Sequence, residues 1–358
     1  MFYVGDYMAS THSAKPFKTY QEQLTILKNR GMRFSNEEDA LRVLRTENYY
    51  RISGYWLTMR RKKTDGTEVF GPSASFDNVM NLYRFDGALR KIILSATMVI
   101  ETNLKAFVAY YHGEKYGPCG YMSYEHAEEI WKHAAFMAAL SKDLFRRQEE
   151  PFVKHHDTDL GGVYPIWVAT EVCSFDQISK FYKNMLPADR SQIAKTYYGI
   201  PSREYIESWL HCAVVARNMA AHGARFYNKS NYTPAVMLPK HLKLHATSFF
   251  GYAYAIYQLL PAADKDGFLN EISQAIEAHS YAITRHLGLP EGWKTLIIRG
   301  ARAGALPGYP DEVRNDVVRY LGYGWEWRVI AKMVNRVHGY SFSAEELKAL
   351  HESSLVSV

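Results

Sequence analysis

The spacing of hydrophobic positions along the chain predicts a protein built almost entirely from α-helices. Over residues 76–112, apolar side chains recur every three or four positions, which is the period of the buried face of a helix. The same period predicts further helices from Thr19 to Gly31, from Asn36, over 124–149, from Pro165 through Cys173, from Ser174, from Pro201 to about His222, over 244–260 and over 264–287. Few segments alternate as strands do, although Asp65-Gly66 fits the turn of a hairpin. The predicted fold class is therefore all-α, in the sense of mostly α.

Composition along the chain divides the predicted helices into three regions. We expect an N-terminal helical region with many aromatic and basic residues at 1–75, a larger helical domain at 76–288, and a small helical extension at 289–358. Residues 290–312 hold three Pro and four Gly, which favours a break before the extension. Within the extension, the stretch from Trp327 past His338 has the spacing of either a helix–turn–helix or a packing hairpin, and the hairpin is the favoured interpretation.

Composition and charge narrow the class of protein. The 358 residues are 47% hydrophobic and 22% charged, which excludes a wholly disordered chain. The net charge of +6 favours polyanionic partners such as RNA, and exposed aromatic rings could stack on unpaired bases, although packed cores also use them. Cys119, Cys173 and Cys212 are odd in number and widely spaced, so neither a disulfide framework nor a zinc site is predicted. We find no secretory signal or membrane-spanning stretch and expect a cytoplasmic protein.

The most informative segment for chemistry runs from Ala216 to Gly223. It places Arg217, Asn218 and His222 in an otherwise apolar helix. A permanent cation among apolar residues is costly unless it is paired, which favours a functional role for Arg217. The alternative is that Arg217 and His222 only complement the helix dipole near the C-terminal end.

The spacing of these three residues constrains how they could act together. Asn218 and His222 are four apart and share a face of the helix. Arg217 and His222 are five apart and diverge by about 140° on an ideal helix. Either the helix distorts near Gly223, or two copies of the chain meet so that Arg217 of one copy and His222 of the other face a shared phosphate.

The residue types suit RNA cleavage. An imidazole transfers protons near neutral pH, and a guanidinium offers a fixed set of donors to a phosphate and its developing charge. Asn218 could orient the phosphate or the imidazole. With the 2′-hydroxyl of RNA as the nucleophile, neither a metal nor another cofactor is required.

Several further blocks accompany this motif in a recognisable order over roughly residues 15–290. They are Lys15–Phe17, Leu27–Gly31, Asn48–Tyr55, Leu82–Arg90, Ile100-Glu101, Pro165–Trp167, Glu171, Ser174-Phe175, Trp209, Arg217-Asn218, Ala221-His222 and Arg225–Asn228. With these blocks the chain resembles the Abi-like proteins of bacterial abortive infection, the AbiD/AbiF group. That family is similar to HEPN domains, whose signature is an Arg, a polar residue and, a few positions later, a His. Arg217, Asn218 and His222 match this signature.

The resemblance implies a HEPN-like helical bundle with additional N-terminal helices and a small helical C-terminal appendage. It implies a metal-independent endoribonuclease that acts as a toxin in antiviral defence, works as a homodimer and is associated with a small noncoding RNA. A second hypothesis is a protein that binds structured RNA on the same fold without cutting it. A pure protein-interaction scaffold would leave the Arg–Asn–His grouping unexplained.

Other polar residues have less specific roles at this stage. Candidate RNA contacts, for which packing or solvated loops are the alternatives, are Arg51, Arg60, Arg61, Lys62, Lys63, Arg225 and Asn228. Glu101 is a supporting residue that either pairs with Arg217 or pairs elsewhere, and the two are equally favoured. The cluster at His155–Asp157 is expected to be a polar loop rather than a metal site.

Overall fold

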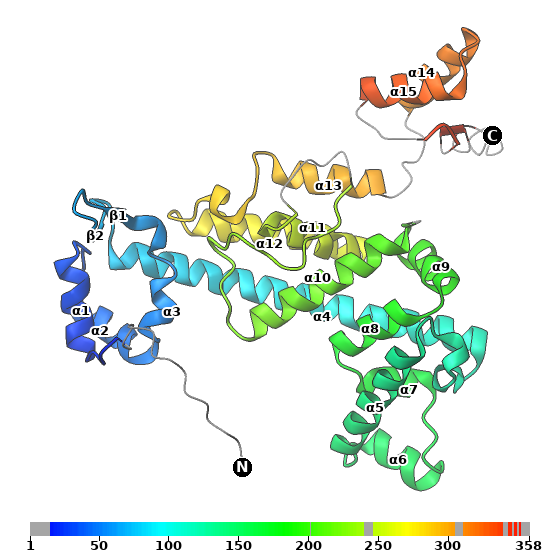
Figure 1. The fold of residues 1–358 in the computed structure, drawn as a ribbon, viewed down its shortest axis with the longest axis horizontal. Helices are drawn as coiled ribbons and strands as arrows, with labels where there is room; N and C mark the ends of the chain where they lie inside the picture. Colours follow the sequence, from blue (N-terminus) through cyan, green and yellow to red (C-terminus); the bar gives the residue numbers. More distant parts are fainter. Residues whose placement is uncertain are drawn as a thin grey trace, which may run out of the picture. The chain divides into compact units, whose positions relative to one another are not determined.

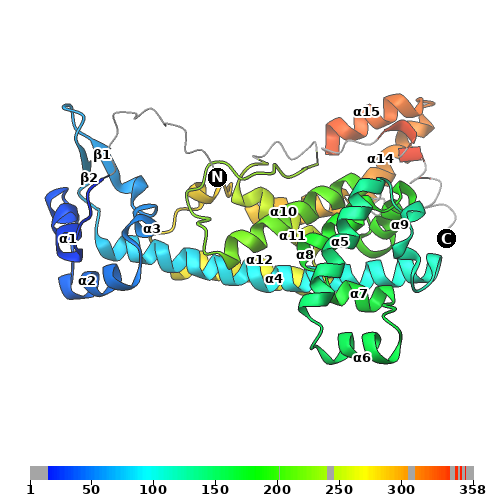
Figure 2. The same ribbon diagram turned by 60° about the horizontal axis from the view of Figure 1, so that its bottom comes forward.

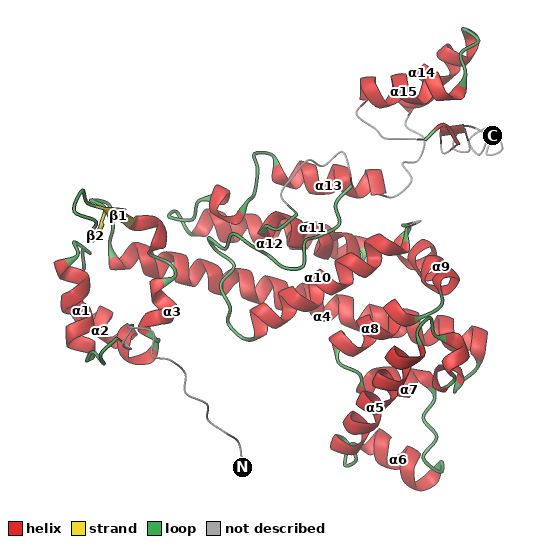
Figure 3. Cartoon of the chain, viewed as in Figure 1, coloured by secondary structure: helices red, strands yellow, loops and turns green. Residues whose placement is uncertain are grey.

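Helices dominate the protein, as Figure 3 shows. The computed structural model describes residues 15–200, 202–239, 246–304 and 311–338, together with 343–345, 347, 348 and 351. Over these residues the strands are limited to one two-stranded antiparallel sheet. The all-α prediction is therefore confirmed.

The chain divides into two compact units. The first holds the residues up to Phe85 and a short return segment, His279–Ala282, and the second holds Asp86–Ala278 and the residues from Ile283 on. The division falls inside helix α4 (Phe76–Tyr116). The three regions expected from composition stay a prediction.

The first unit is made of short helices and a hairpin whose ends follow from local polar residues. Its elements are α1 (Tyr20–Asn29), α2 (Glu37–Thr46), α3 (Tyr49–Ser53), the 3-10 turn η1 (Leu57–Met59), β1 (Arg60–Lys62), β2 (Glu68–Phe70) and the first turns of α4. Thr19 and Glu22 form a capping box at the start of α1, and Asn36 caps α2. The apolar faces of α1 and α2 pack on each other and bury Leu24 and Leu44.

The hairpin confirms the turn predicted at Asp65-Gly66. Arg60 pairs with Phe70, and Lys62 with Glu68. Gly66 has a φ of 82°, a left-handed conformation that glycine adopts without strain, and the Asp65 carboxylate accepts a hydrogen bond from the Thr67 amide at 2.8 Å.

In the second unit, shorter helices lie along the part of the long helix α4 that begins at Asp86 (Figures 1 and 2). They are η2 (Gly120–Met122), η3 (Tyr124–His126), α5 (Ile130–Arg146), α6 (Pro151–Asp159), α7 (Ile166–Val172), α8 (Phe175–Asn184), α9 (Pro187–Tyr198), α10 (Arg203–Ala221), α11 (Phe249–Leu259), α12 (Ala262–Ala278), η4 (Thr284–Leu287) and α13 (Trp293–Gly304). In this unit α4 buries Leu89, Ile93, Ile100 and Leu104, which confirms the periodic apolar face read from the sequence. Length and apolarity alone would let α4 cross a membrane, but buried core helices pass the same test, so this is weak evidence.

Helix α11 lies at the centre of this unit. All of its residues are buried, and it packs against α10, α12 and α13. A helix that is apolar on every side is stable only when other elements cover it, so α10, α12 and α13 must pack around α11.

Two of the predicted elements are wrong in detail. Residues His155–Asp157 lie inside helix α6 rather than in a loop, since Pro151 begins that helix and the His156 imidazole Nδ1 pairs with the Phe152 carbonyl oxygen at 2.7 Å. The helix expected over 264–287 ends at Ala278 and is followed by the separate turn η4. Of the helix expected over 244–260, the residues up to 245 lie outside the described part of the chain.

The C-terminal helices α14 (Asp311–Gly322) and α15 (Trp327–His338) form a small hairpin with its own apolar cluster. Val317 and Ile330 are fully buried in it, and the rings of Tyr320 and Trp325 stack at 4.9 Å. This agrees with the packing-hairpin interpretation. Most of the segment after His338, which the helix–turn–helix interpretation needs, lies outside the described residues.

A buried carboxylate ties α9 to the C-terminal end of α4. Asp189 is fully buried and accepts hydrogen bonds from the hydroxyls of Tyr111 at 2.9 Å and Tyr116 at 2.7 Å, and it also pairs with Lys115. The next residue, Arg190, is buried between Glu128 and Glu207. Buried charges are tolerated when partners satisfy them, so these two residues anchor α9 on both sides.

Replacing Asp189 with Asn should lower the free energy of unfolding near neutral pH by about 1–3 kcal/mol, because two tyrosines and a lysine would lose an ionised acceptor. Burial by itself raises the pKa of Asp189, but the hydrogen bonds from Lys115, Tyr116 and Tyr111 outweigh it and hold the pKa below its ordinary value of 3.8. The carboxylate therefore contributes fully above about pH 4, and its contribution is lost as the pH falls through the lowered native pKa. Urea unfolding of wild type and variant, once near neutral pH and once below pH 4, measures the contribution of the carboxylate to stability.

The control is Asp39→Asn, which changes an exposed carboxylate paired with Arg42 and should stay within about 0.5 kcal/mol of wild type. Equal losses in the two variants, or a difference that grows in acid, would contradict the role given to Asp189.

Candidate functional site

Helix α10 carries the Arg–Asn–His motif near its C-terminal end. Its apolar face, which includes Trp209, Ala213 and Ala216, is buried against α11 and α8. This burial fixes the rotation of the helix, because turning it would expose these side chains. The motif residues consequently lie at the edge of the buried face, where Arg217 is half-buried and Asn218 and His222 are exposed.

The helix ends in a Schellman motif directly after the histidine. The Gly223 amide donates to the Ala220 carbonyl at 3.1 Å, and the Ala224 amide donates to the Met219 carbonyl at 2.7 Å. Gly223 takes the left-handed conformation that this motif requires, with a φ of 67°. The His222 amide still makes the helical bond to the Asn218 carbonyl at 3.0 Å, so the backbone stays helical up to the histidine.

The structure brings two of the three motif side chains together. The Arg217 guanidinium donates to the Asn218 side-chain oxygen at 3.2 Å. Within the described residues, no hydrogen bond or ion pair joins the His222 imidazole to either of them. Because the helix turns away only after His222, the distortion offered as one explanation does not intervene between Arg217 and His222. Completion of the set by a second copy of the chain stays a prediction.

A fully buried carboxylate holds the chain that follows the motif. Asp86, on α4, accepts hydrogen bonds from the amides of Phe226 at 3.0 Å and Tyr227 at 2.7 Å through the same oxygen. Its other oxygen pairs with Arg90 at 2.7 Å. We call residues 223–228 the post-motif segment. Its backbone is thus fixed to α4 by a charge that would be costly to leave without these partners.

Further contacts fix the other side of the post-motif segment. The Tyr232 hydroxyl donates to the Phe226 carbonyl at 2.7 Å, and the Tyr227 hydroxyl pairs with the His286 imidazole at 2.8 Å. Burial, and then the charge of Asp86, raises the pKa of Tyr232 well above 10, so its hydroxyl remains a donor at neutral pH. Burial, and then the charge of Arg285, lowers the pKa of His286, which keeps that ring neutral.

Two residues proposed as RNA contacts belong to the post-motif segment. Asn228 has a φ of 51°, a left-handed conformation that asparagine tolerates, and its amide donates to the His286 carbonyl at 3.0 Å. Asn228 therefore has a structural role as the residue that reverses the chain. Arg225 is half-buried, and its positive charge lies near Tyr232. The RNA contacts of both residues stay predictions.

Glu101 takes the second of its two expected roles. It pairs with Lys105 one turn further along α4, at 3.2 Å. No contact between Glu101 and Arg217 is present among the described residues, so support of Arg217 by Glu101 is not part of this arrangement.

The remaining candidate RNA contacts lie in the first unit, around the hairpin. Arg51 is exposed on α3, and Arg60 pairs with Glu68 across the strands at 3.0 Å. Arg61, Lys62 and Lys63 are exposed. A basic, exposed hairpin is compatible with contacts to an RNA backbone, which stay a prediction.

Sequence reasoning missed the part played by Asp86. The signal was present, because Asp86 and Arg90 are four apart within the apolar period of the longest helix, and such a pair in a buried face indicates a satisfied internal charge. Nothing in the sequence indicated that the partners of Asp86 would be two backbone amides far along the chain.

Comparison with known proteins gives one match. A model of the family described as Abi-like protein matches residues 42–228, which is more than half of the chain. The matched range runs from α2 to the end of the post-motif segment and includes Asp86 and all three motif residues. No curated protein and no solved structure matches the chain.

Replacing Asp86 with Ala should destabilise the protein by about 3–5 kcal/mol, because Arg90 and two amides would lose the buried charge that satisfies them. The loss of stability should appear in the unfolding of the whole protein and also in the post-motif segment itself. Hydrogen exchange should show faster exchange of the Phe226 and Tyr227 amides, while the helical amides of α1 keep their protection until the protein unfolds.

Asp77→Ala is the matched control, since Asp77 is an exposed carboxylate near the start of the same helix and accepts a hydrogen bond from Ser35. If the post-motif amides remained fully protected in Asp86→Ala, the carboxylate would not be what holds them.

Proposed function

The chain belongs to the Abi-like protein family, and on this premise we propose that it acts in abortive infection as an anti-phage endoribonuclease of the HEPN type. The observation that carries the proposal is the presentation of Arg217, Asn218 and His222 at the surface end of a buried helix. Arg217 is half-buried, whereas Asn218 and His222 are in solvent, where an RNA strand can reach them.

The proposed reaction is internal transesterification of RNA. The 2′-oxygen forms a bond to the adjacent phosphorus, the bond from phosphorus to the 5′-oxygen breaks, and the products carry a 2′,3′-cyclic phosphate and a 5′-hydroxyl. His222 removes the proton from the attacking hydroxyl or supplies the proton that the leaving oxygen takes up. Arg217 binds the phosphate and neutralises the charge that develops on it, while Asn218 holds the guanidinium through its side-chain oxygen. No metal enters these steps.

The active species is a homodimer in this proposal. Among the described residues, no hydrogen bond or ion pair joins the His222 imidazole to Arg217 or Asn218, and Arg217 and His222 diverge on a helix that stays regular between them. A two-fold axis near the ends of two α10 helices would bring Arg217 of one copy to His222 of the other, and would form the site twice.

RNA is the partner class that the net charge and the exposed basic hairpin favour, whether as a substrate or as an associated small noncoding RNA. A second candidate function, binding of structured RNA without cleavage, is favoured by one observation. Among the described residues, Arg217 and Asn218 are joined by a hydrogen bond that arranges them for phosphate contacts, whereas no hydrogen bond joins the His222 imidazole to either side chain.

His222→Ala should abolish RNA cleavage and toxicity, with a loss of about 100-fold or more, because the general acid–base group would be gone. The control is His211→Ala, which removes another exposed histidine of the same helix and should leave cleavage unchanged. The assay is the mapping of RNA 5′ and 3′ ends after incubation with purified protein in the presence of a chelator.

Full toxicity of the His222→Ala variant would contradict the proposal that the protein is a nuclease. If wild type and His222→Ala both bound RNA equally and neither cleaved it, the second candidate function would replace the first.

Co-expression of Arg217→Ala and His222→Ala chains tests the dimeric site. Each variant alone should be inactive, whereas a mixed dimer retains one site with both functional side chains. Random pairing should therefore restore about a quarter of the wild-type activity. No recovery in dimers shown to be mixed would mean that both side chains must come from the same copy.

A further inference from the structure

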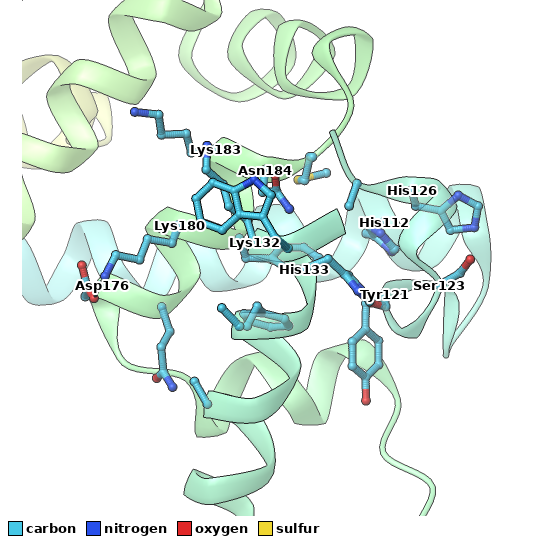
Figure 4. Close-up of a pocket in the computed structure, with 18 residues that line it drawn as sticks. His112, Tyr121, Ser123, His126, Lys132, His133, Asp176, Lys180, Lys183 and Asn184 are labelled. Atoms are coloured by element: carbon cyan, nitrogen blue, oxygen red, sulfur yellow. Dashed lines mark hydrogen bonds and ion pairs between the residues drawn. The ribbon is translucent and has the colours of Figure 1, made fainter. Parts of the chain in front are cut away.

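The second unit contains a cavity that is not part of the motif site. Its volume is about 520 Å³, within the range of roughly 300–1,000 Å³ that is usual for small-molecule sites. It lies between α5, α8, the turns η2 and η3 and the last turns of α4 (Figure 4). The lining is mostly aromatic and apolar, with a few basic and polar groups among it.

One buried side-chain nitrogen in this lining has no hydrogen-bond partner. His112 is 1% exposed, and its ring atom Nδ1 has no hydrogen bond within the described residues. Two other buried polar side chains of the lining are satisfied: His133 Nε2 pairs with the Tyr121 carbonyl at 3.0 Å, and Asn184 makes hydrogen bonds in both directions with the backbone of Glu129. Leaving a buried nitrogen unpaired is costly, and a ligand of the cavity that reaches this nitrogen would remove the cost.

The charge state of His112 suits recognition of a neutral polar edge. Burial, and then the charge of His126, lowers the pKa of His112 to about 4. The ring is therefore neutral at physiological pH and offers a hydrogen bond rather than a positive charge.

Aromatic rings form a continuous wall beside His112. The Phe136 and Phe181 rings lie 4.7 Å apart, and the Phe181 ring lies 5.5 Å from the His112 ring. Trp131 also lines the cavity although it is 67% exposed, and the Lys132 ammonium lies 5.1 Å from its ring centre. A flat heteroaromatic ring placed against such surfaces gains stacking energy.

The charged groups of the lining are predominantly basic. Lys132, Lys180 and Lys183 stand against one carboxylate, Asp176, which pairs with Lys180 at 2.6 Å. Lys183 is exposed, and no ion pair of its ammonium group is present among the described residues. In Figure 4, Lys180 and Lys183 lie on one side of the cavity and His112 and His126 on the other, so an anionic group and a polar ring edge would meet their partners at opposite ends.

Other ligand classes fit these features less well. A purely apolar ligand would leave His112 Nδ1 unpaired and would not use the lysines. The histidines of the lining do not form a group that could hold a metal ion among the described residues.

We propose that this cavity binds a nucleotide, with the base against the aromatic rings and His112 and the phosphate toward Lys180 and Lys183. The nucleotide is either a free nucleoside 5′-phosphate or one unpaired residue of an RNA strand. Both share the same base, ribose and phosphate, and they are distinguished by experiment. The site is separate from the Arg217–His222 motif, so it stands whether or not the chain cleaves RNA.

The test is titration of the full-length protein, freed of bound nucleic acid, with each of the four nucleoside 5′-monophosphates. Tryptophan fluorescence and calorimetry measure the binding. A short single-stranded oligonucleotide with 2′-O-methyl groups is titrated in parallel, because it cannot be cleaved through its 2′-oxygen. Adenosine and inorganic phosphate are the partial ligands, and each should bind at least about tenfold more weakly than AMP.

Lys183→Ala should weaken nucleotide binding by about tenfold and leave the affinity for adenosine unchanged, since it removes a phosphate contact. Lys195→Ala, which removes an exposed lysine of α9 outside the cavity lining, is the matched control and should bind as wild type does. His112→Phe keeps a ring of similar size and should weaken adenosine and AMP alike. A thermal melt of each variant separates loss of binding from loss of folding.

Saturable binding of monophosphates but not of the oligonucleotide identifies a free nucleotide as the ligand, whereas tighter binding of the oligonucleotide, with competition by monophosphates, identifies an RNA residue. The proposal is overturned if no nucleotide binds at millimolar concentration, if inorganic phosphate binds as well as AMP does, or if Lys183→Ala and His112→Phe, both folded, bind as wild type does.

Discussion

The arrangement around the motif depends on one buried negative charge. Asp86 lies on the longest helix, has no exposure to solvent and is satisfied by Arg90 and by two backbone amides that come just after the motif helix. Because a carboxylate in this position is tolerated only with all its partners in place, α4 and the post-motif segment must fold together. The position of the helix end that presents Arg217, Asn218 and His222 follows from this contact and from the burial of α10 against α11.

The same principle recurs elsewhere in the second unit. Asp189 joins α9 to α4 through two tyrosines and a lysine, and Arg190 joins it to Glu128 and Glu207. Apolar packing accounts for the fully buried α11 and decides which face of each neighbouring helix turns inward. Internal ion pairs with fixed hydrogen-bond directions add further contacts between these helices. The motif residues and the cavity lined by α5 and α8 are thus carried by helices that these internal contacts join.

The sequence was sufficient for what depends on local spacing. The three-to-four residue period predicted α4, Asn36 predicted the start of α2, and Asp65-Gly66 predicted the hairpin. It was insufficient where a local signal was passed over and where distant groups decide. His155–Asp157 became helical because Pro151 begins a helix there, and the chain between Ala278 and Thr284 left the helical period that the apolar spacing indicated. The cavity could not be foreseen either, because His112 and Phe181 come from segments that only the fold brings together.

The contacts of the post-motif segment also determine when, during synthesis of the chain, this segment can fold. The Tyr227 hydroxyl pairs with the His286 imidazole, and the Asn228 amide donates to the His286 carbonyl. During synthesis, the motif is made more than fifty residues before His286. A nascent or prematurely terminated chain would carry Arg217 and His222 without the groups that set the segment behind them. The segment behind the motif can therefore reach its final contacts only after His286 has been made.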